Sequence, residues 1–91
     1  MHSKFWPLES RPSTLLSRFP LRCEGLVVDY ENPELTMPNK IIEMGLLPGT
    51  TFIILHQAPF RGPLYIEYGQ ERTRIALRVE EAAFIKVEAI R

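Results

Sequence analysis

The sequence predicts a mainly β fold, a small barrel of short strands with one or two short helices. The first observation is the length of 91 residues, which indicates one domain with a compact core. The second is a series of short stretches in which apolar and polar residues alternate with the two-residue period of a strand. The third is the close spacing of Gly and Pro turn signals between those stretches. A barrel lets so few residues enclose a core without long exposed sheet edges.

The N-terminal third is predicted to hold a tail, a helical turn and a first strand. Residues 1–12 combine aromatic residues, prolines and scattered charge without periodicity, which favours a flexible tail before a folded domain of residues 13–91. Ser13 is expected to cap a short helical turn over residues 14–17. The branched apolar residues of segment 22–30 predict the first strand.

Residues 36–44 predict a short helix. Thr36 is its expected N-cap, with Pro38 in the first turn, where the missing amide costs little. The apolar residues Met37, Ile41 and Met44 recur at helical spacing, which favours a helix. Gly45 is expected to end this helix in the left-handed conformation, and Pro48 with Gly49 predicts a turn.

The second half of the chain predicts the remaining strands. Residues 51–57 alternate imperfectly, so both faces are expected to be partly covered. Residues 64–68 place Leu64, Ile66 and Tyr68 on one face, and residues 73–78 place Ile75 and Leu77 inward. The stretch VEEAA predicts one helical turn, and alternation over residues 85–88 predicts a last strand.

Charge and cysteine content narrow the function classes. Eleven Lys and Arg balance eleven Asp and Glu, so no net field attracts nucleic acid or anionic lipid, and nucleic-acid binding is disfavoured. Apolar runs fall far short of the ~20 residues that span a bilayer, and no signal peptide precedes them, so a cytoplasmic location without membrane insertion is expected. The single cysteine, Cys23, allows neither an internal disulfide nor a thiolate cluster.

Motifs for catalysis or metal binding are not found in the sequence. No phosphate-binding loop, nucleophile elbow or Cys/His pair is present, so no catalytic residue, enzyme activity or cofactor is expected. Neither of the two histidines, His2 and His56, lies at a metal-binding spacing from another likely ligand. No metal ligand is therefore assigned, and any transition-metal binding is expected to be weak.

The stretch MGLLPG, residues 44–49, places two leucines where polar turn residues are usual. Leu46 is expected to pack under the helix end as the apolar contact that follows a glycine C-cap. Leu47 would then be exposed, in a connection that does not need a second leucine. The sequence thus raises the prediction that a partner covers Leu47.

Residues 39–88 resemble the FeoA family of ferrous iron transport accessory proteins. Three segments carry the resemblance in order: the helix ending in GLLPGT, the segment APFRGP, and the closing ALRVEEAAFIKV. The resemblance extends less clearly back to Ser13. It implies an SH3-like β-barrel and a small cytoplasmic partner of FeoB, a membrane-embedded ferrous iron transporter with a cytoplasmic GTPase domain. Asn39 and Lys40 stand where the family commonly has two arginines.

Within this resemblance, two apolar turns are the expected partner-binding elements. They consist of Leu46, Leu47 and Pro48, and of Pro59 and Phe60, with Gly45 and Gly49 as structural residues. Leu47, Pro48 and Phe60 are expected to lie close together, because a single exposed leucine marks a binding surface only as part of a patch. Preordered apolar residues bind well because they lose little entropy.

Two other functions stay open. One is a metal sensor or iron chaperone, which would need ligands from separate strands such as His56 and Glu67. The other is a generic SH3-like module that binds peptides. Tyr65 and Tyr68 fall on opposite faces of their strand, which speaks against a shared aromatic groove.

Overall fold

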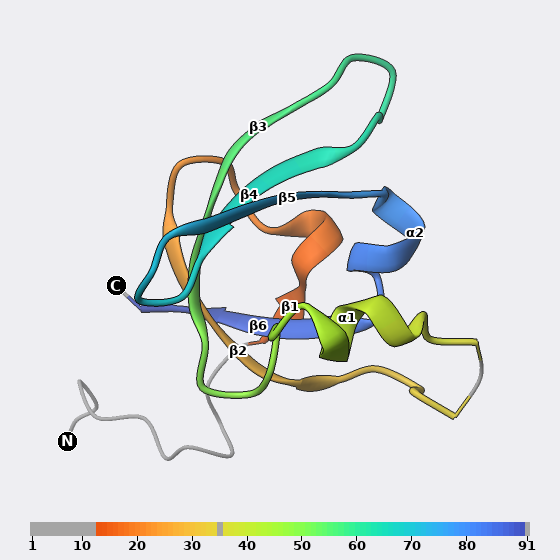
Figure 1. Cartoon of the computed structure of the whole chain (residues 1–91). Coiled ribbons are helices and arrows are strands. Elements are labelled where there is room, and N and C mark those ends of the chain that lie inside the picture. Colours follow the sequence, from red (N-terminus) through yellow and green to blue (C-terminus); the bar gives the residue numbers. More distant parts are fainter. Residues whose placement is uncertain (1–12, 35, 91) are drawn as a thin grey trace, which may run out of the picture.

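Residues 13–34 and 36–90, which the computed structural model describes, form six strands, two short α-helices and one 3-10 turn (Figure 1). The predicted tail, residues 1–12, lies outside the described residues. In chain order the elements are β1 (Thr14–Leu15), η2 (Leu16–Arg18), β2 (Glu24–Tyr30), α1 (Asn39–Glu43), β3 (Thr51–Gln57), β4 (Leu64–Tyr68), β5 (Thr73–Leu77), α2 (Val79–Ala82) and β6 (Ile85–Ala89). The predicted mainly β class with short helices is confirmed.

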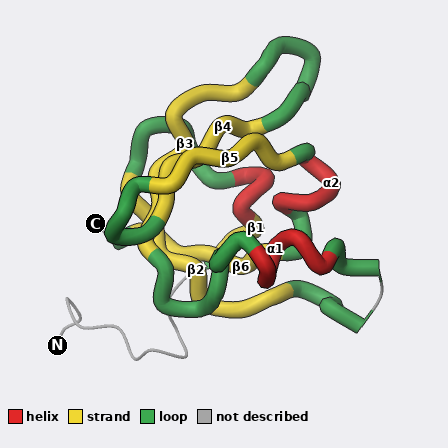
Figure 2. The backbone as a smooth tube through the Cα atoms, in the orientation of Figure 1, coloured by secondary structure: helices red, strands yellow, loops and turns green. Residues whose placement is uncertain are grey.

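All six strands belong to one antiparallel sheet with the order β1-β6-β2-β3-β4-β5. Irregular pairing between Val27 and Asp29 and between Ile54 and His56 interrupts two of the ladders. Such bulges bend a strand and increase its twist. Figure 2 shows the result, in which the strands curl around the core while the helices lie together on one side. The sheet is barrel-like, with β1 and β5 at its two ends rather than paired to each other.

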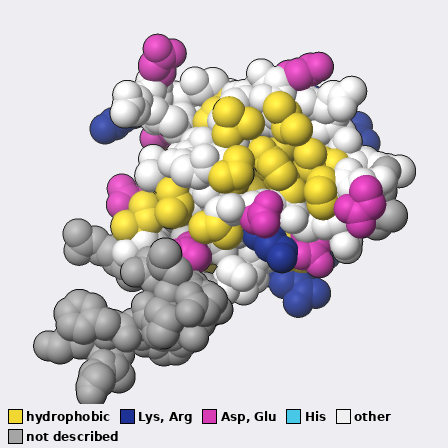
Figure 3. Space-filling view, turned by 90° about the horizontal axis from the view of Figure 1, so that it is seen from below, with side chains coloured by type: hydrophobic (Ala, Val, Ile, Leu, Met, Phe, Trp, Pro, Cys, Tyr) yellow, Lys and Arg dark blue, Asp and Glu magenta, His cyan; other side chains and the backbone are white. Residues whose placement is uncertain are grey.

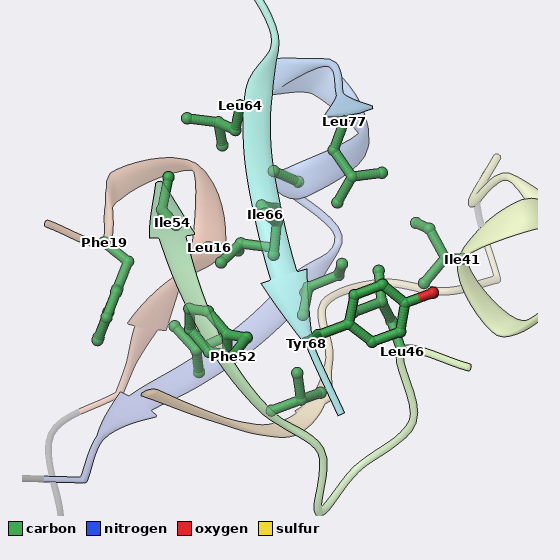
Figure 4. Packing of buried hydrophobic residues seen from close by; sticks show 14 residues of the cluster. Leu16, Phe19, Ile41, Leu46, Phe52, Ile54, Leu64, Ile66, Tyr68 and Leu77 are labelled. Carbon is green, nitrogen blue, oxygen red and sulfur yellow. The ribbon is translucent and has the colours of Figure 1, made fainter. Parts of the chain in front are cut away.

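The core fills the inside of this curl with side chains from almost every element (Figure 4). The alternation predicted for β4 is confirmed, because Leu64, Ile66 and Tyr68 are buried while Tyr65 is exposed. Buried positions on β3 alternate in the same way. The buried apolar side chains are Leu16, Phe19, Val27, Ile41, Leu46, Phe52, Ile54, Leu64, Ile66, Tyr68, Leu77, Ala82, Ile85 and Val87.

Two predicted helix caps are wrong. Thr14 and Leu15 pair with β6 as β1, so η2 begins only at Leu16 and Ser13 lies too far away to cap it. Pro38 is the N-cap of α1, with extended backbone angles of φ −64° and ψ 136°, and α1 begins at Asn39 rather than near Thr36. In both cases the preceding backbone is extended, which a capping residue type alone does not reveal.

Gly45 ends α1 as predicted, with φ +91°. Its N–H donates to the Ile42 carbonyl at 2.9 Å, and the Leu46 N–H donates to the Ile41 carbonyl at 3.1 Å. This pair of bonds is a Schellman motif, which needs a left-handed residue at the glycine position. Ile41 and Leu46 are both fully buried, which supplies the apolar contact that usually accompanies the motif. The predicted burial of Leu46 is confirmed.

An ion pair joins the two helices. The Lys40 ammonium lies 2.9 Å from the Glu81 carboxylate, which also accepts a hydrogen bond of 2.9 Å from the Arg78 N–H at the start of α2. Partial burial raises the pKa of Glu81. The Arg78 N–H, the Lys40 ammonium and the Arg78 guanidinium lower this pKa, and together they outweigh the effect of burial. The net pKa of Glu81 therefore lies below its ordinary value, and its charged form stabilises the contact between α1 and α2.

The left-handed backbone of Gly45 generates the first prediction. Gly45→Val should lower the free energy of unfolding by at least about 1–2 kcal/mol, because a β-branched residue is strained at positive φ. An added Cβ would meet only Tyr68 Cε2, at 4.0 Å, so the loss would come from the backbone. Denaturant unfolding measures it, with Gly45→Asn as the control that should lose less. Equal stability of wild type and the valine variant would contradict this helix end.

The Glu81 ion pair generates a pH-dependent prediction. Because the folded-state pKa of Glu81 is lowered, its contribution is complete above the unfolded carboxyl pKa of about 4.3 and is lost as pH falls through the folded value. Glu81→Gln should therefore lower the melting temperature at about pH 6, and the difference from wild type should shrink at about pH 3. The exposed neighbour Glu80 provides the control variant Glu80→Gln, for which no such pH-dependent difference is expected.

Candidate partner-binding surface

The loop from Met44 to Thr50 joins α1 to β3 through two consecutive turns. After the Schellman motif, the Thr50 N–H donates to the Leu47 carbonyl at 3.0 Å. Pro48 and Gly49, the latter with φ +97°, are the central residues of this second turn. A proline followed by a residue at positive φ is the pattern of a type II turn. The predicted turn at Pro48 and Gly49 is thus confirmed.

Three side-chain hydroxyls fix the backbone of this loop. Tyr68 donates to the Met44 carbonyl, Thr50 to the Gly45 carbonyl at 3.3 Å, and Tyr30 to the Leu46 carbonyl at 2.9 Å. Carbonyls at a helix C-terminus lack partners within the helix, so these bonds satisfy three successive acceptors. Burial raises the pKa of Tyr68, and burial followed by the nearby Asp29 carboxylate raises that of Tyr30. Both phenols therefore stay protonated as donors.

The loop is also attached to the sheet. The Gly49 N–H donates to the Val27 carbonyl, and the Val27 N–H donates to the Thr50 carbonyl, each at 2.8 Å. Figure 4 shows the Tyr68 ring beside Leu46, with its hydroxyl turned away from the centre of the core. Backbone and side-chain bonds thus hold the loop from β2, β4 and α1, and its exposed side chains project from a rigid support.

Leu47 projects from this support into solvent, with 46% of its side-chain surface exposed, while Leu46 is fully buried. Ile42 and Met44, which precede Leu47 closely in the sequence, are exposed at 49% and 38%, and Pro48 is exposed as well. We call these four residues, Ile42, Met44, Leu47 and Pro48, the Leu47 surface. Figure 3 shows a broad hydrophobic area with charged side chains along its edge on the face seen from below, where β2 and the loop between α1 and β3 lie in Figure 1.

Met44 follows Met37 and Ile41 at helical spacing in the sequence. Ile41 is fully buried, whereas Met44 is exposed. Because α1 ends at Glu43, Met44 is the C-cap residue, and the chain leaves the helix before a second turn can place it over the core. The exposure of Ile42 and Met44 adds to the element that sequence reasoning assigned to Leu46, Leu47 and Pro48. Of these three, Leu46 is fully buried and offers no surface to a partner.

Pro59 and Phe60 lie at the other end of β3, in the hairpin that joins it to β4 (Figure 1). The seven residues of β3 span about 20 Å at ~3.3 Å per residue. The expected closeness of Phe60 to Leu47 and Pro48 is therefore wrong, because an extended strand separates the two turns. Phe60 is nevertheless 99% exposed, and the structure leaves two separate apolar elements.

The two residues considered as metal ligands have other contacts. The His56 ring stacks on Tyr65 with 4.5 Å between ring centroids, and Glu67 accepts a hydrogen bond of 3.2 Å from Arg74 Nε. Tyr65 is the cross-strand partner of His56, whereas Glu67 pairs with Ile53. Within residues 13–34 and 36–90, no three His, Cys, Asp or Glu side chains are grouped to hold a metal ion.

The helices of the described residues are also too short and too polar for any of them to cross a membrane.

Comparison with known proteins gives the family. The FeoA domain model matches residues 14–89. A crystal structure of FeoA, an iron uptake regulatory protein, is 29% identical, with a TM-score of 0.70 and coverage of 87% of this chain and 99% of that one. The FeoA-like protein of Clostridium acetobutylicum is 26% identical, with a TM-score of 0.76 and coverage of 87% and 88%.

A third similar structure is described by its fold. The zinc complex of FeoA from Stenotrophomonas maltophilia, described as a procaryotic SH3 domain protein, is 26% identical, with a TM-score of 0.67 and coverage of 82% and 89%. The SH3-like architecture predicted from the sequence agrees with this description. With the family match extending from β1 to β6, this chain belongs to the FeoA family, which is associated with ferrous iron transport.

Proposed function

We propose that this chain is a non-enzymatic, cytoplasmic accessory protein of ferrous iron uptake that binds the cytoplasmic part of a FeoB-type membrane GTPase transporter. Membership of the FeoA family supports the link to iron transport. The FeoA of S. maltophilia has itself been suggested to act as a ferrous iron transport activating factor. In this proposal the Leu47 surface contacts the transporter.

The observation that carries the proposal is an exposed leucine on a loop whose backbone is held by hydrogen bonds on both sides of that leucine. Leu47 lies between Gly45 and Gly49, both at positive φ, and the carbonyls before it accept hydrogen bonds from Tyr68, Thr50 and Tyr30. A surface that is already ordered loses little conformational entropy on binding. Single exposed leucines are ordinary, but here three further exposed apolar residues, Ile42, Met44 and Pro48, lie within five positions of Leu47 in the chain.

The size of this surface limits what it can do alone. Each of its three large side chains is about half exposed or less, so covering them contributes about 1 kcal/mol each. A micromolar complex requires about 8 kcal/mol. The Leu47 surface is therefore one part of a larger interface, in which its central residue acts as an anchor and polar contacts supply specificity.

The proposal predicts a separation of function from folding at Leu47. Leu47→Lys should change the free energy of unfolding by less than about 0.5 kcal/mol, as surface substitutions usually do. It should nevertheless abolish transporter capture in a pull-down and ferrous iron uptake in a strain that depends on this protein, because an ammonium would replace the apolar anchor.

Leu21 provides the matched control, since its 45% exposure is close to the 46% of Leu47 but it lies in the turn before β2. Leu21→Lys should fold, bind and support uptake as wild type does. Unfolding of the Leu47 variant would make Leu47 a core residue. Normal binding and uptake by a folded Leu47 variant would move the docking surface elsewhere.

Metal titration separates this proposal from a metal sensor or iron chaperone. Since His56 and Glu67 contact Tyr65 and Arg74 rather than a shared site, calorimetry with Zn²⁺ or Fe²⁺ should give binding no tighter than about micromolar, and His56→Ala should change it little. One stoichiometric site of much higher affinity that is lost in His56→Ala would favour the sensor or chaperone instead.

A further inference from the structure

We propose that Phe60 and Arg61, at the tip of the β3–β4 hairpin, form a second anchor for the same transporter. In this proposal the Phe60 ring enters an apolar pocket of the transporter, and Arg61 pairs with carboxylates at the rim of that pocket. This inference rests on the proposed function, and it identifies a second contact site together with the chemistry of the partner surface.

The hairpin tip is a tight and well-fixed turn. Phe60 and Arg61 have φ of +60° and +55°, and the Gly62 N–H donates to the carbonyls of both Ala58 and Pro59, each at 3.1 Å. Two consecutive residues at positive φ are a feature that this turn shares with type I′ turns. Below it, the Ala58 N–H donates to the Pro63 carbonyl at 2.9 Å and Gln57 Nε2 donates to the Gly62 carbonyl at 3.0 Å.

The residue types at the tip are unfavourable for this turn. Asn and Gly are strongly preferred at the two central positions, because bulky side chains are strained at positive φ. The glycine of this hairpin stands one position later, where a Cβ at Gly62 would come within 2.8 Å of the Ala58 Cβ. The chain therefore keeps Phe60 and Arg61 at strained positions that Asn and Gly would occupy without strain.

Folding gives no reason for Phe60. Its side chain is 99% exposed, so it contributes no burial to the core. Sites where non-glycine residues hold positive φ often have binding roles. An aromatic ring presented in full to solvent on a rigid turn can enter a pocket with little further loss of entropy.

Charge defines the rim of that pocket. Between Thr50 and Ile66 the sequence contains no Asp or Glu, and Arg61 is its single Lys or Arg. Arg61 is exposed next to Phe60. A guanidinium beside an apolar ring matches an apolar pocket edged by carboxylates, which Arg can bind through two parallel hydrogen bonds. Aromatic and Arg anchors are also the residue types that dominate interface energetics.

A membrane surface is the less favoured occupant. One ring and one guanidinium have less affinity for a bilayer than a single myristoyl chain, which by itself gives only marginal binding. A transporter pocket requires less binding free energy from the hairpin tip, because the Leu47 surface already binds the same partner. The two elements lie at opposite ends of β3, about 20 Å apart, so binding at one raises the effective concentration at the other.

The test replaces the tip by the sequence that the turn prefers. Phe60→Asn combined with Arg61→Gly should leave the melting temperature unchanged or raise it, because the strain at both positions is removed. The same double variant should bind full-length transporter in nanodiscs of zwitterionic lipid roughly tenfold more weakly or worse than wild type. Arg61→Glu should also weaken binding, since it brings a carboxylate to an acidic rim.

The outcomes separate this inference from the proposed function. If Leu47→Lys abolishes binding and the double tip variant binds like wild type, the second anchor is wrong while the proposed function stands. If wild type does not bind the transporter, both are wrong. A lower melting temperature of the double variant would give Phe60 and Arg61 a structural role instead.

A vesicle experiment separates a pocket from lipid. Neither wild type nor the double tip variant should sediment with phosphatidylglycerol vesicles that lack the transporter. Sedimentation of wild type that the double variant loses would assign the tip to the membrane and overturn the pocket. Unchanged or tighter binding of Arg61→Glu to the transporter would overturn the acidic rim.

Discussion

The left-handed backbone at Gly45 is the constraint on which the rest of the candidate surface depends. It reverses the chain at the end of α1, so that Leu46 can return to the core beside Ile41 while Leu47 faces solvent. A β-branched residue would be strained in this conformation. The division of the neighbouring leucines between core and surface would then be less stable.

The hydroxyls of Tyr30, Thr50 and Tyr68 turn that reversal into a rigid element. They come from β2, from the loop itself and from β4, yet they bind three successive carbonyls. A carbonyl left without a partner near the core would be destabilising, so these bonds serve folding as well as order in the loop. The same contacts that complete the end of α1 therefore prepare the surface proposed to bind the transporter.

A nearly neutral chain must recognise a partner through local features rather than a long-range field. The structure offers two such features at opposite ends of β3, one broad and apolar, the other a single ring beside a guanidinium. A small barrel suits this arrangement, because a strand that is hydrogen-bonded to neighbours on both sides holds the turns at its two ends at a fixed separation. For a partner that contacts both turns, specificity would depend on the distance between them as well as on their side chains.

The sequence by itself determined the elements whose signals are local. Alternation located β3, β4 and β6 closely, and the order Gly45, Leu46, Leu47 indicated which leucine would be buried, because strand period and glycine conformation depend on neighbouring residues. The prediction of a helix cap at Ser13 was wrong because strand pairing makes the following backbone extended, as where Thr14 pairs with Val87. Only the tertiary structure joined Tyr68 to Met44, separated Phe60 from Leu47 and exposed Met44. These relations depend on how strands pair and curl over distances that no local pattern encodes.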